Sequence, residues 1–141
     1  MVKQYPVIIT VRDRLSCLEQ LLSWLEGMGQ NEIWLCDNAS TFPPLVKFLE
    51  TTKHNVVYNN FNLGHRAPWL SGLAFELGLD SHFIVTDPDV VPCEECPADV
   101  FEHFERALGT FPDIDKVGFS LRIDDIPEHY VHAANVVKWE T

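Results

Sequence analysis

Short apolar runs alternate with helical patterns along the whole chain, and this alternation limits the possible folds more than any other property of the sequence. The first run, Pro6 to Val11, is continuous and rich in β-branched residues, as expected for a strand covered on both faces. Strands that alternate with helices of about ten residues indicate a parallel sheet with right-handed crossovers. The sequence therefore predicts a three-layer α/β/α fold with a mostly parallel sheet.

The expected elements follow from periodicity and from turn residues. Strands are predicted at residues 6–11, 32–37, 55–59, 81–86 and 116–121. Helices are predicted at about residues 15–25, 43–49, 67–77, 97–108 and 128–139.

Size and charge narrow the function classes. A chain of 141 residues fits a single domain over residues 1–141. Its 21 acidic and 10 basic residues give a formal net charge of −11, which repels polyanions and argues against a nucleic acid polymer as partner. The apolar runs are strand-sized, too short for a signal peptide or a membrane span, so a cytoplasmic protein is expected.

The four cysteines have different patterns. Cys17 and Cys36 lie in apolar patterns typical of buried thiols. Cys93 and Cys96 have the C-x-x-C spacing of a zinc site or a redox pair. A second ligand pair at suitable spacing is absent, so two free loop thiols are the favoured interpretation.

Polar residues follow each expected strand. In parallel sheets a ligand lies beyond the carboxyl ends of the strands. The residues expected there are Thr10, Arg12, Asp13, Asp37, Asn38, Asn60, Asn62, Gly64, His65, Arg66, Asp87, Asp89, Arg122, Asp124 and Asp125.

The motif Asp87-Pro88-Asp89 ends the fourth strand. Two carboxylates one residue apart can meet one divalent ion and the diphosphate that it carries, and oxygen ligands select Mg²⁺ or Mn²⁺. The alternative is an ordinary Asp-Pro-Asp turn.

Two further segments suit a nucleotide. An exposed Asp37 carboxylate can accept a hydrogen bond from a base N–H, whereas Asn38 and Ser40 can also simply cap the next helix. Gly64 permits close backbone approach ahead of a helix N-terminus, where Arg66 can contact a phosphate. The alternative for Arg66 is a solvated loop side chain.

These pieces together resemble the family 2 glycosyltransferases of GT-A fold. The resemblance covers roughly residues 5–125 and rests on four segments in order: residues 6–14, 33–40, 62–64 and 85–89. It implies a nucleotide-diphosphate-sugar donor, a Mn²⁺ or Mg²⁺ cofactor, and inverting transfer of the sugar to the hydroxyl of a saccharide or another acceptor.

The resemblance also implies roles for individual residues. Thr10 and Arg12 border the nucleotide, Asp37 reads the base, and Arg66 lies near the diphosphate. Asp87 and Asp89 hold the metal, and Asn38, Asn62 and Gly64 belong to the same nucleotide-sugar site. Asp124 and Asp125 are the candidate catalytic bases, with an ordinary Asp-Asp turn before Pro127 as the alternative.

Similar enzymes continue beyond a point equivalent to residue 141, so the chain is expected to be a fragment that lacks the acceptor-binding part. The apolar face that this part would cover is then expected to be exposed, which favours a homo-oligomer.

Two other functions stay open. One is a non-catalytic nucleotide-sugar-binding or interaction domain. The other is a haloacid-dehalogenase-like phosphatase, in which Asp87 is the nucleophile and Asp89 the general acid.

Overall fold

The computed structural model describes residues 2–141, which form two compact units. Unit 1 ends at Ala98 and unit 2 runs from Asp99 to Thr141, so the single domain expected over the whole chain comprises two structural units. The elements of unit 1 are β1 (Val7–Val11), α1 (Ser16–Gly27), β2 (Ile33–Asp37), α2 (Pro43–Thr51), β3 (Asn55–Tyr58), the 3-10 helix η1 (Gly64–Arg66), α3 (Ala67–Leu70), α4 (Leu73–Leu77) and β4 (Ile84–Thr86). Unit 2 contains α5 (Val100–Thr110) and α6 (Ala133–Glu140).

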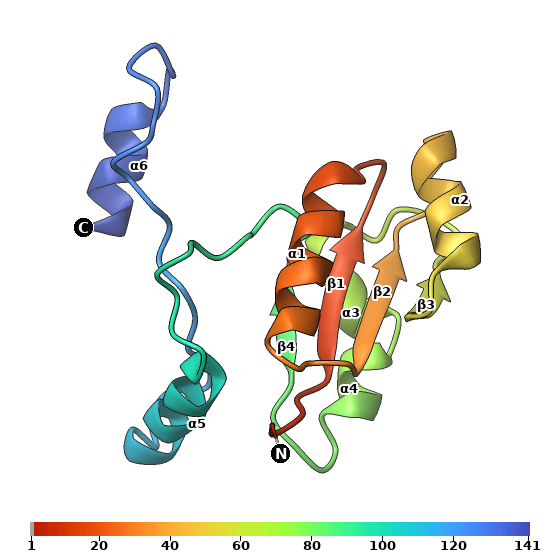
Figure 1. Cartoon of the computed structure of the whole chain (residues 1–141), viewed down its shortest axis with the longest axis horizontal. Helices are drawn as coiled ribbons and strands as arrows, with labels where there is room; N and C mark the ends of the chain where they lie inside the picture. The colour runs from red at the N-terminus through yellow and green to blue at the C-terminus, as the bar shows by residue number, and fades with distance from the viewer. Residues whose placement is uncertain (1) are drawn as a thin grey trace. The chain divides into compact units, whose positions relative to one another are not determined.

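Unit 1 is built on a sheet of four parallel strands in the order β3-β2-β1-β4 (Figure 1). Val11 pairs with Asp37, and Asp37 pairs with Tyr58, so β1, β2 and β3 end level with one another. On the other side of β1, Thr86 at the end of β4 pairs with Ile9. The prediction of an α/β fold with a parallel sheet is confirmed, and the polar residues that follow the strands lie along one edge.

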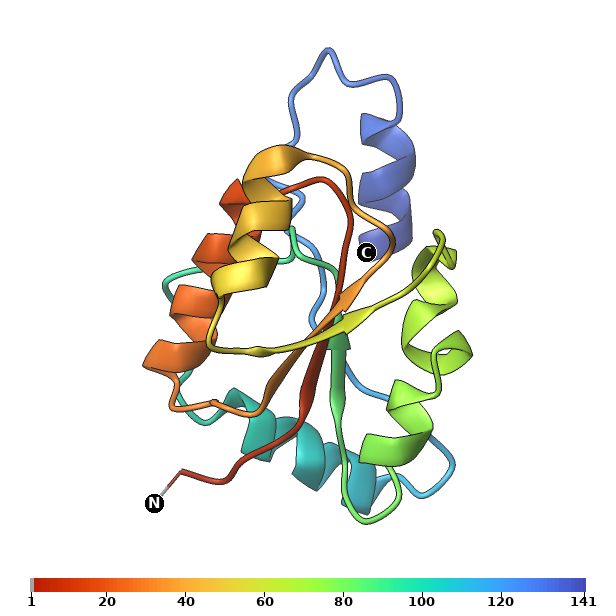
Figure 2. The same ribbon diagram turned by 90° about the vertical axis from the view of Figure 1, so that its right-hand side faces the viewer.

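Helices cover both faces of this sheet, as Figure 2 shows, with α1 and α2 on one side and α3 and α4 on the other. On the side of α3 and α4, Ile8 and Cys36 form a buried cluster with Ala67, Leu73 and Ala74. Strand residues alternate between faces, so the neighbouring β1 residues face α1 and α2, whose apolar stripes are also buried. This arrangement is compatible with the three layers expected.

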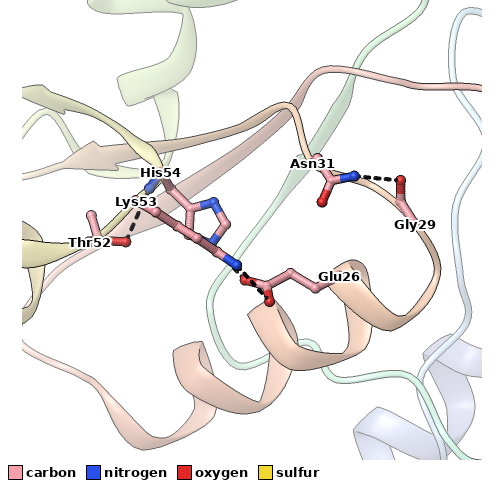
Figure 3. Close-up of polar contacts among 6 residues, drawn as sticks. All are labelled: Glu26, Gly29, Asn31, Thr52, Lys53 and His54. Carbon is pink, nitrogen blue, oxygen red and sulfur yellow. Dashed lines mark hydrogen bonds and ion pairs between the residues drawn. The ribbon is translucent and has the colours of Figure 1, made fainter.

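A polar cluster lies at the opposite, amino-terminal edge of the sheet (Figure 3). The carboxylate of Glu26, near the end of α1, contacts Nζ of Lys53 at 3.1 Å and Nε2 of His54 at 2.9 Å. The His54 side chain is only 6% exposed, whereas that of Lys53 is 71% exposed. The cluster joins α1 to the turn between α2 and β3.

The single helix predicted over residues 67–77 is wrong, because two short helices, α3 and α4, occupy this segment. Gly72 separates them with a φ of 84°, in the left-handed region that only glycine enters readily. The amino end of this segment is a 3-10 turn followed by a four-residue helix, so it offers little aligned backbone dipole to an anion.

The strand predicted at residues 116–121 is also wrong, since the structure has no strand in the described part of unit 2. A strand needs a hydrogen-bonded neighbour, and this segment makes other contacts within unit 2. The ring of Phe119 packs edge-on against Phe104 with centroids 5.1 Å apart, and the backbone N–H of Leu121 donates to Glu140. Within residues 2–141, no helix is both long and apolar enough to cross a membrane.

Candidate functional site at the carboxyl edge of the sheet

The loops after β2 and β3 are joined by the side chain of Asn38, which is 3% exposed. Its Nδ2 donates to the carbonyl of Gly64 at 3.0 Å, and its Oδ1 accepts from the backbone N–H of Leu63 and from Nδ2 of Asn59, each at 3.3 Å. The amide is therefore engaged at both ends. Asn38 fixes the position of the loop over residues 59–64 rather than presenting a polar group to a ligand.

Asp37 is buried as well, with 4% of its surface exposed, which differs from the exposed carboxylate expected. Its carboxylate accepts a hydrogen bond from the backbone N–H of Ser40 at 3.3 Å. In this arrangement Asp37 caps the turn that leads into α2. A base N–H would reach the carboxylate only if the turn over residues 38–40 moved.

The loop after β1 is tied to the start of α2 by Asp13. Its Oδ1 accepts from the backbone N–H groups of Thr41 at 2.6 Å and Phe42 at 2.8 Å, and its own N–H donates to Oγ of Ser40 at 3.1 Å. The two N–H donors, of Phe42 first and Thr41 second, lower the pKa of the Asp13 carboxyl group. Asp13 is thereby a negatively charged clamp between the first two strand ends.

Two non-glycine residues at this edge have left-handed backbone conformations, Asp13 with φ of 52° and Ala39 with φ of 54°. Such conformations cost about 1–3 kcal/mol each, and they persist only where neighbouring contacts enforce them. They cluster at binding and active sites in proteins. The strain at the ends of both β1 and β2 therefore marks this edge as a candidate site.

Two arginines extend from the same loop. Nη1 of the exposed Arg12 donates to the backbone carbonyl of Asn38 at 2.8 Å, which holds the guanidinium over the end of β2. Nη1 of Arg14 lies 3.4 Å from Oδ2 of Asp89, beyond the end of β4. Thr10, the last residue but one of β1, is half-buried beneath this loop. Arg12 and Arg14 thus reach toward opposite sides of the β1 end.

A groove of about 500 Å³ runs between the β1 loop, the first turn of α1, the start of α2 and Asp89 beyond the end of β4. Asp13, Arg14, Phe42, Pro44 and Asp89 contribute to its lining. Its volume lies in the range of roughly 300–1,000 Å³ that is usual for small-molecule sites. A second hollow of about 620 Å³ is lined by one helix alone, from Ser16 to Trp24, and contains no strand-end residue. The groove is therefore the candidate binding site.

The metal residues expected from the sequence are Asp87 and Asp89, and both are exposed at the end of β4. Within residues 2–141, no group of three or more His, Cys, Asp or Glu side chains is arranged to hold a metal ion. Proteins usually hold Mg²⁺ through one or two carboxylates together with substrate phosphates and water. Asp87 and Asp89 do not belong to a closed cage of protein ligands.

The remaining residues predicted for the nucleotide-sugar site lie in the loop before α3. Asn62, Gly64 and Arg66 are all exposed. Oδ1 of Asn62 accepts from the backbone N–H of Gly64 at 2.9 Å, so these two residues form a local turn that Asn38 anchors. Arg66 stands at the junction of η1 and α3 with its side chain in solvent.

The candidate bases belong to unit 2. Asp124 accepts two hydrogen bonds from Arg122, from Nε and from Nη2, each at 2.8 Å. These bonds lower the pKa of the Asp124 carboxyl group, which makes it a weaker base. Asp125 is exposed beside it.

Arg14 and Phe42 were not among the residues expected at this edge from the sequence, although both line the groove. Asp13 was expected there, and one signal also pointed to Arg14, because Arg12-Asp13-Arg14 places two cations around a carboxylate directly after a buried strand. Phe42 carried no such signal, because its place in the groove depends on how α2 begins.

Comparison with protein-family models, with curated proteins and with solved structures found no match to this chain.

Proposed function

We propose that the chain binds a nucleotide-diphosphate-sugar at the carboxyl edge of the unit 1 sheet and acts as a glycosyltransferase of GT-A type. The observation that carries the proposal is the groove in which Asp89, from the Asp87-Pro88-Asp89 motif, faces Arg14. A carboxylate and a guanidinium that share one groove supply a site for a divalent cation and a contact for a phosphate. The sheet order and the helices on both faces are compatible with the GT-A fold.

The charges of this edge suit a diphosphate only in the presence of a cation. The chain carries a net charge of −11, Asp13 and Asp89 line the groove, and Asp87 precedes Asp89 by two residues. When Mn²⁺ or Mg²⁺ is bound, it stabilises the charge that develops on the leaving diphosphate. Arg14 and Arg12 add positive charge from the β1 loop, and the aromatic face of Phe42 offers a surface for a ring.

Inverting transfer also requires a base that removes the proton from the acceptor hydroxyl. Of the two candidates, Asp125 is better suited, because Asp124 is held by Arg122 and has a lowered pKa. Asp124 then acts as a structural partner of Arg122.

A non-catalytic nucleotide-sugar-binding domain is the second candidate, favoured by the engagement of Asp124 with Arg122. A panel of labelled nucleotide-sugars separates the two functions when incubated with saccharide acceptors and Mn²⁺. Glycosyltransferase function predicts a labelled product whose anomeric configuration is inverted. Donor binding without transfer would support the binding domain, and the absence of any donor binding would reject both.

A further inference from the structure

The loop that follows β4 contains a second group of reactive side chains, outside the groove. Cys93 and Cys96 occupy the first and last positions of a turn, which the backbone N–H of Cys96 closes by donating to the carbonyl of Cys93 at 3.1 Å. Cys93 is exposed and Cys96 is half-buried, and both are free thiols. Pro92 and Pro97 flank the turn and restrict its backbone.

We propose that Cys93 and Cys96 form a redox-active dithiol that is oxidised to an intramolecular disulfide by a small organic disulfide. The first and fourth Cα atoms of a β-turn lie within about 7 Å of each other. Disulfides join Cα atoms about 4.4–6.8 Å apart, so the turn brings the two cysteines into the required range. This inference does not depend on the proposed function of the groove.

The two thiols differ in a way that assigns their order of reaction. Burial, and secondly the nearby Cys93, raise the pKa of the Cys96 thiol, so Cys96 is the poorer nucleophile toward an external reagent. Cys93 is the accessible one. Cys93 is therefore the attacking cysteine and Cys96 the resolving cysteine.

The reaction proceeds in two balanced steps. The Cys93 thiolate attacks one sulfur of the small disulfide, which forms a mixed disulfide at Cys93 and releases the first small thiolate. The Cys96 thiolate then attacks Sγ of Cys93, which forms the Cys93–Cys96 bond and releases the second small thiolate. The protein loses two electrons and two thiol protons, and the small disulfide gains both electrons and becomes two thiols.

Charge selects the kind of disulfide that reacts. Glu94 and Glu95 lie between the two cysteines, within a chain of net charge −11. These charges repel an anionic disulfide and attract a cationic one. We expect the cationic disulfide cystamine to oxidise the pair several times faster than anionic oxidised glutathione at equal concentration, and added salt should reduce the difference.

A protease that cleaves after glutamate gives a direct test, because Glu94 and Glu95 separate the two cysteines. The full chain is treated with cystamine and freed of excess reagent. Its remaining thiols are then alkylated in denaturant, so that the buried Cys36 also reacts, and the chain is digested. We expect the Cys93 and Cys96 peptides to remain joined until a reductant is added, and Cys17 and Cys36 to be alkylated. In Cys96→Ser, the reaction with cystamine should stop at a mixed disulfide on Cys93. Cys93→Ser should react with cystamine several times more slowly than the unmodified chain. Cys17→Ser is the control and should react like the unmodified chain.

Three results would overturn the proposal. The first is separation of the two peptides without reductant, with both cysteines alkylated or carrying cystamine. The second is a disulfide that contains Cys17 or Cys36 instead. The third is resistance of the pair to cystamine until a chelator removes one zinc ion per chain, which would make it a metal site.

Discussion

Arg14 and Asp89 are 75 residues apart in the sequence, yet Nη1 of Arg14 lies 3.4 Å from Oδ2 of Asp89. The contact connects the loop after β1 to the loop after β4 across the groove. Both side chains are substantially exposed, at 72% and 48%, so the pair contributes little to folding stability. Its consequence is chemical, because the guanidinium would compete for Asp89 with the metal ion that we propose there.

This competition gives the first prediction. Arg14→Ala should increase the affinity of the chain for Mn²⁺ alone by about two- to fivefold, which corresponds to the typical strength of an exposed ion pair. Arg14→Lys keeps the charge and should change the affinity less. Titration of Mn²⁺ by electron paramagnetic resonance measures the effect, and equal affinity in all three proteins would show that the metal does not use Asp89.

The second prediction concerns the clamp formed by Asp13. Asp13→Ala removes the acceptor of the Thr41 and Phe42 N–H groups, so its melting temperature at pH 7 should fall below that of Asp13→Asn, which keeps one side-chain oxygen. Both variants should be less stable than the unmodified chain.

The same clamp predicts a pH dependence. The pKa of Asp13 is lowered in the folded chain, so its stabilising effect is present above the pKa of the unfolded state, at about 4. The effect is lost as the pH falls through the lower folded-state pKa. The stability difference between the unmodified chain and Asp13→Asn should therefore shrink below about pH 4, and a difference that grew in acid would contradict this account.

A third prediction separates the two contacts of Glu26. Lys53 contributes most to the lowered pKa of Glu26, but His54 is the partner whose side chain is buried. Glu26→Gln should destabilise the chain by about 1 kcal/mol, because it weakens the hydrogen bond of a buried imidazole. Lys53→Ala should cost at most about 0.5 kcal/mol, as expected for an exposed ion pair. Urea unfolding measures both, and a larger loss for Lys53→Ala would reverse the assignment.

The fourth prediction tests the break between α3 and α4. Gly72→Ala places a side chain on a residue whose φ is 84°, which should cost about 1–2 kcal/mol, although no atom lies within 4 Å of the added Cβ. Gly27→Ala, also without contacts within 4 Å but without a positive φ, is the matched control and should be neutral or slightly stabilising. If Gly72→Ala were equally harmless, backbone strain would not explain the break.

The helices and strands that depend on local sequence patterns were predicted well. The helix stripes of α1 and α2 and the apolar runs of β1, β2 and β3 placed these elements within one or two residues, because burial on one or both faces leaves a periodic signal. Residues 116–121 have the same kind of apolar pattern, but a strand also needs a partner, and the pattern does not contain one. The helix predicted over residues 67–77 ignored the preference of Gly72 for a left-handed backbone.

The candidate site was predictable only in outline. The strand ends identified the edge of the sheet and therefore Arg12, Asp37 and Asp89. The burial of Asp37, and the use of Asn38 as a tether for the loop after β3, depend on how the following loops fold back. The Arg14–Asp89 contact joins two loops from distant parts of the chain, and a local sequence pattern does not show which distant loops meet in the fold.

Calorimetric titration of the full chain with UDP and with GDP, in Mn²⁺ and in EDTA, tests the central claim most directly. We predict that at least one of the two nucleotides binds in Mn²⁺ and that binding in EDTA is weaker by tenfold or more, because a diphosphate beside Asp87 and Asp89 needs a cation between them. Asp89→Ala should lose the effect of Mn²⁺, whereas Asp80→Ala, an exposed carboxylate elsewhere in unit 1, should keep it. Equal affinity in Mn²⁺ and EDTA, or an Asp89→Ala variant that still responds to Mn²⁺, would contradict the metal-dependent nucleotide site.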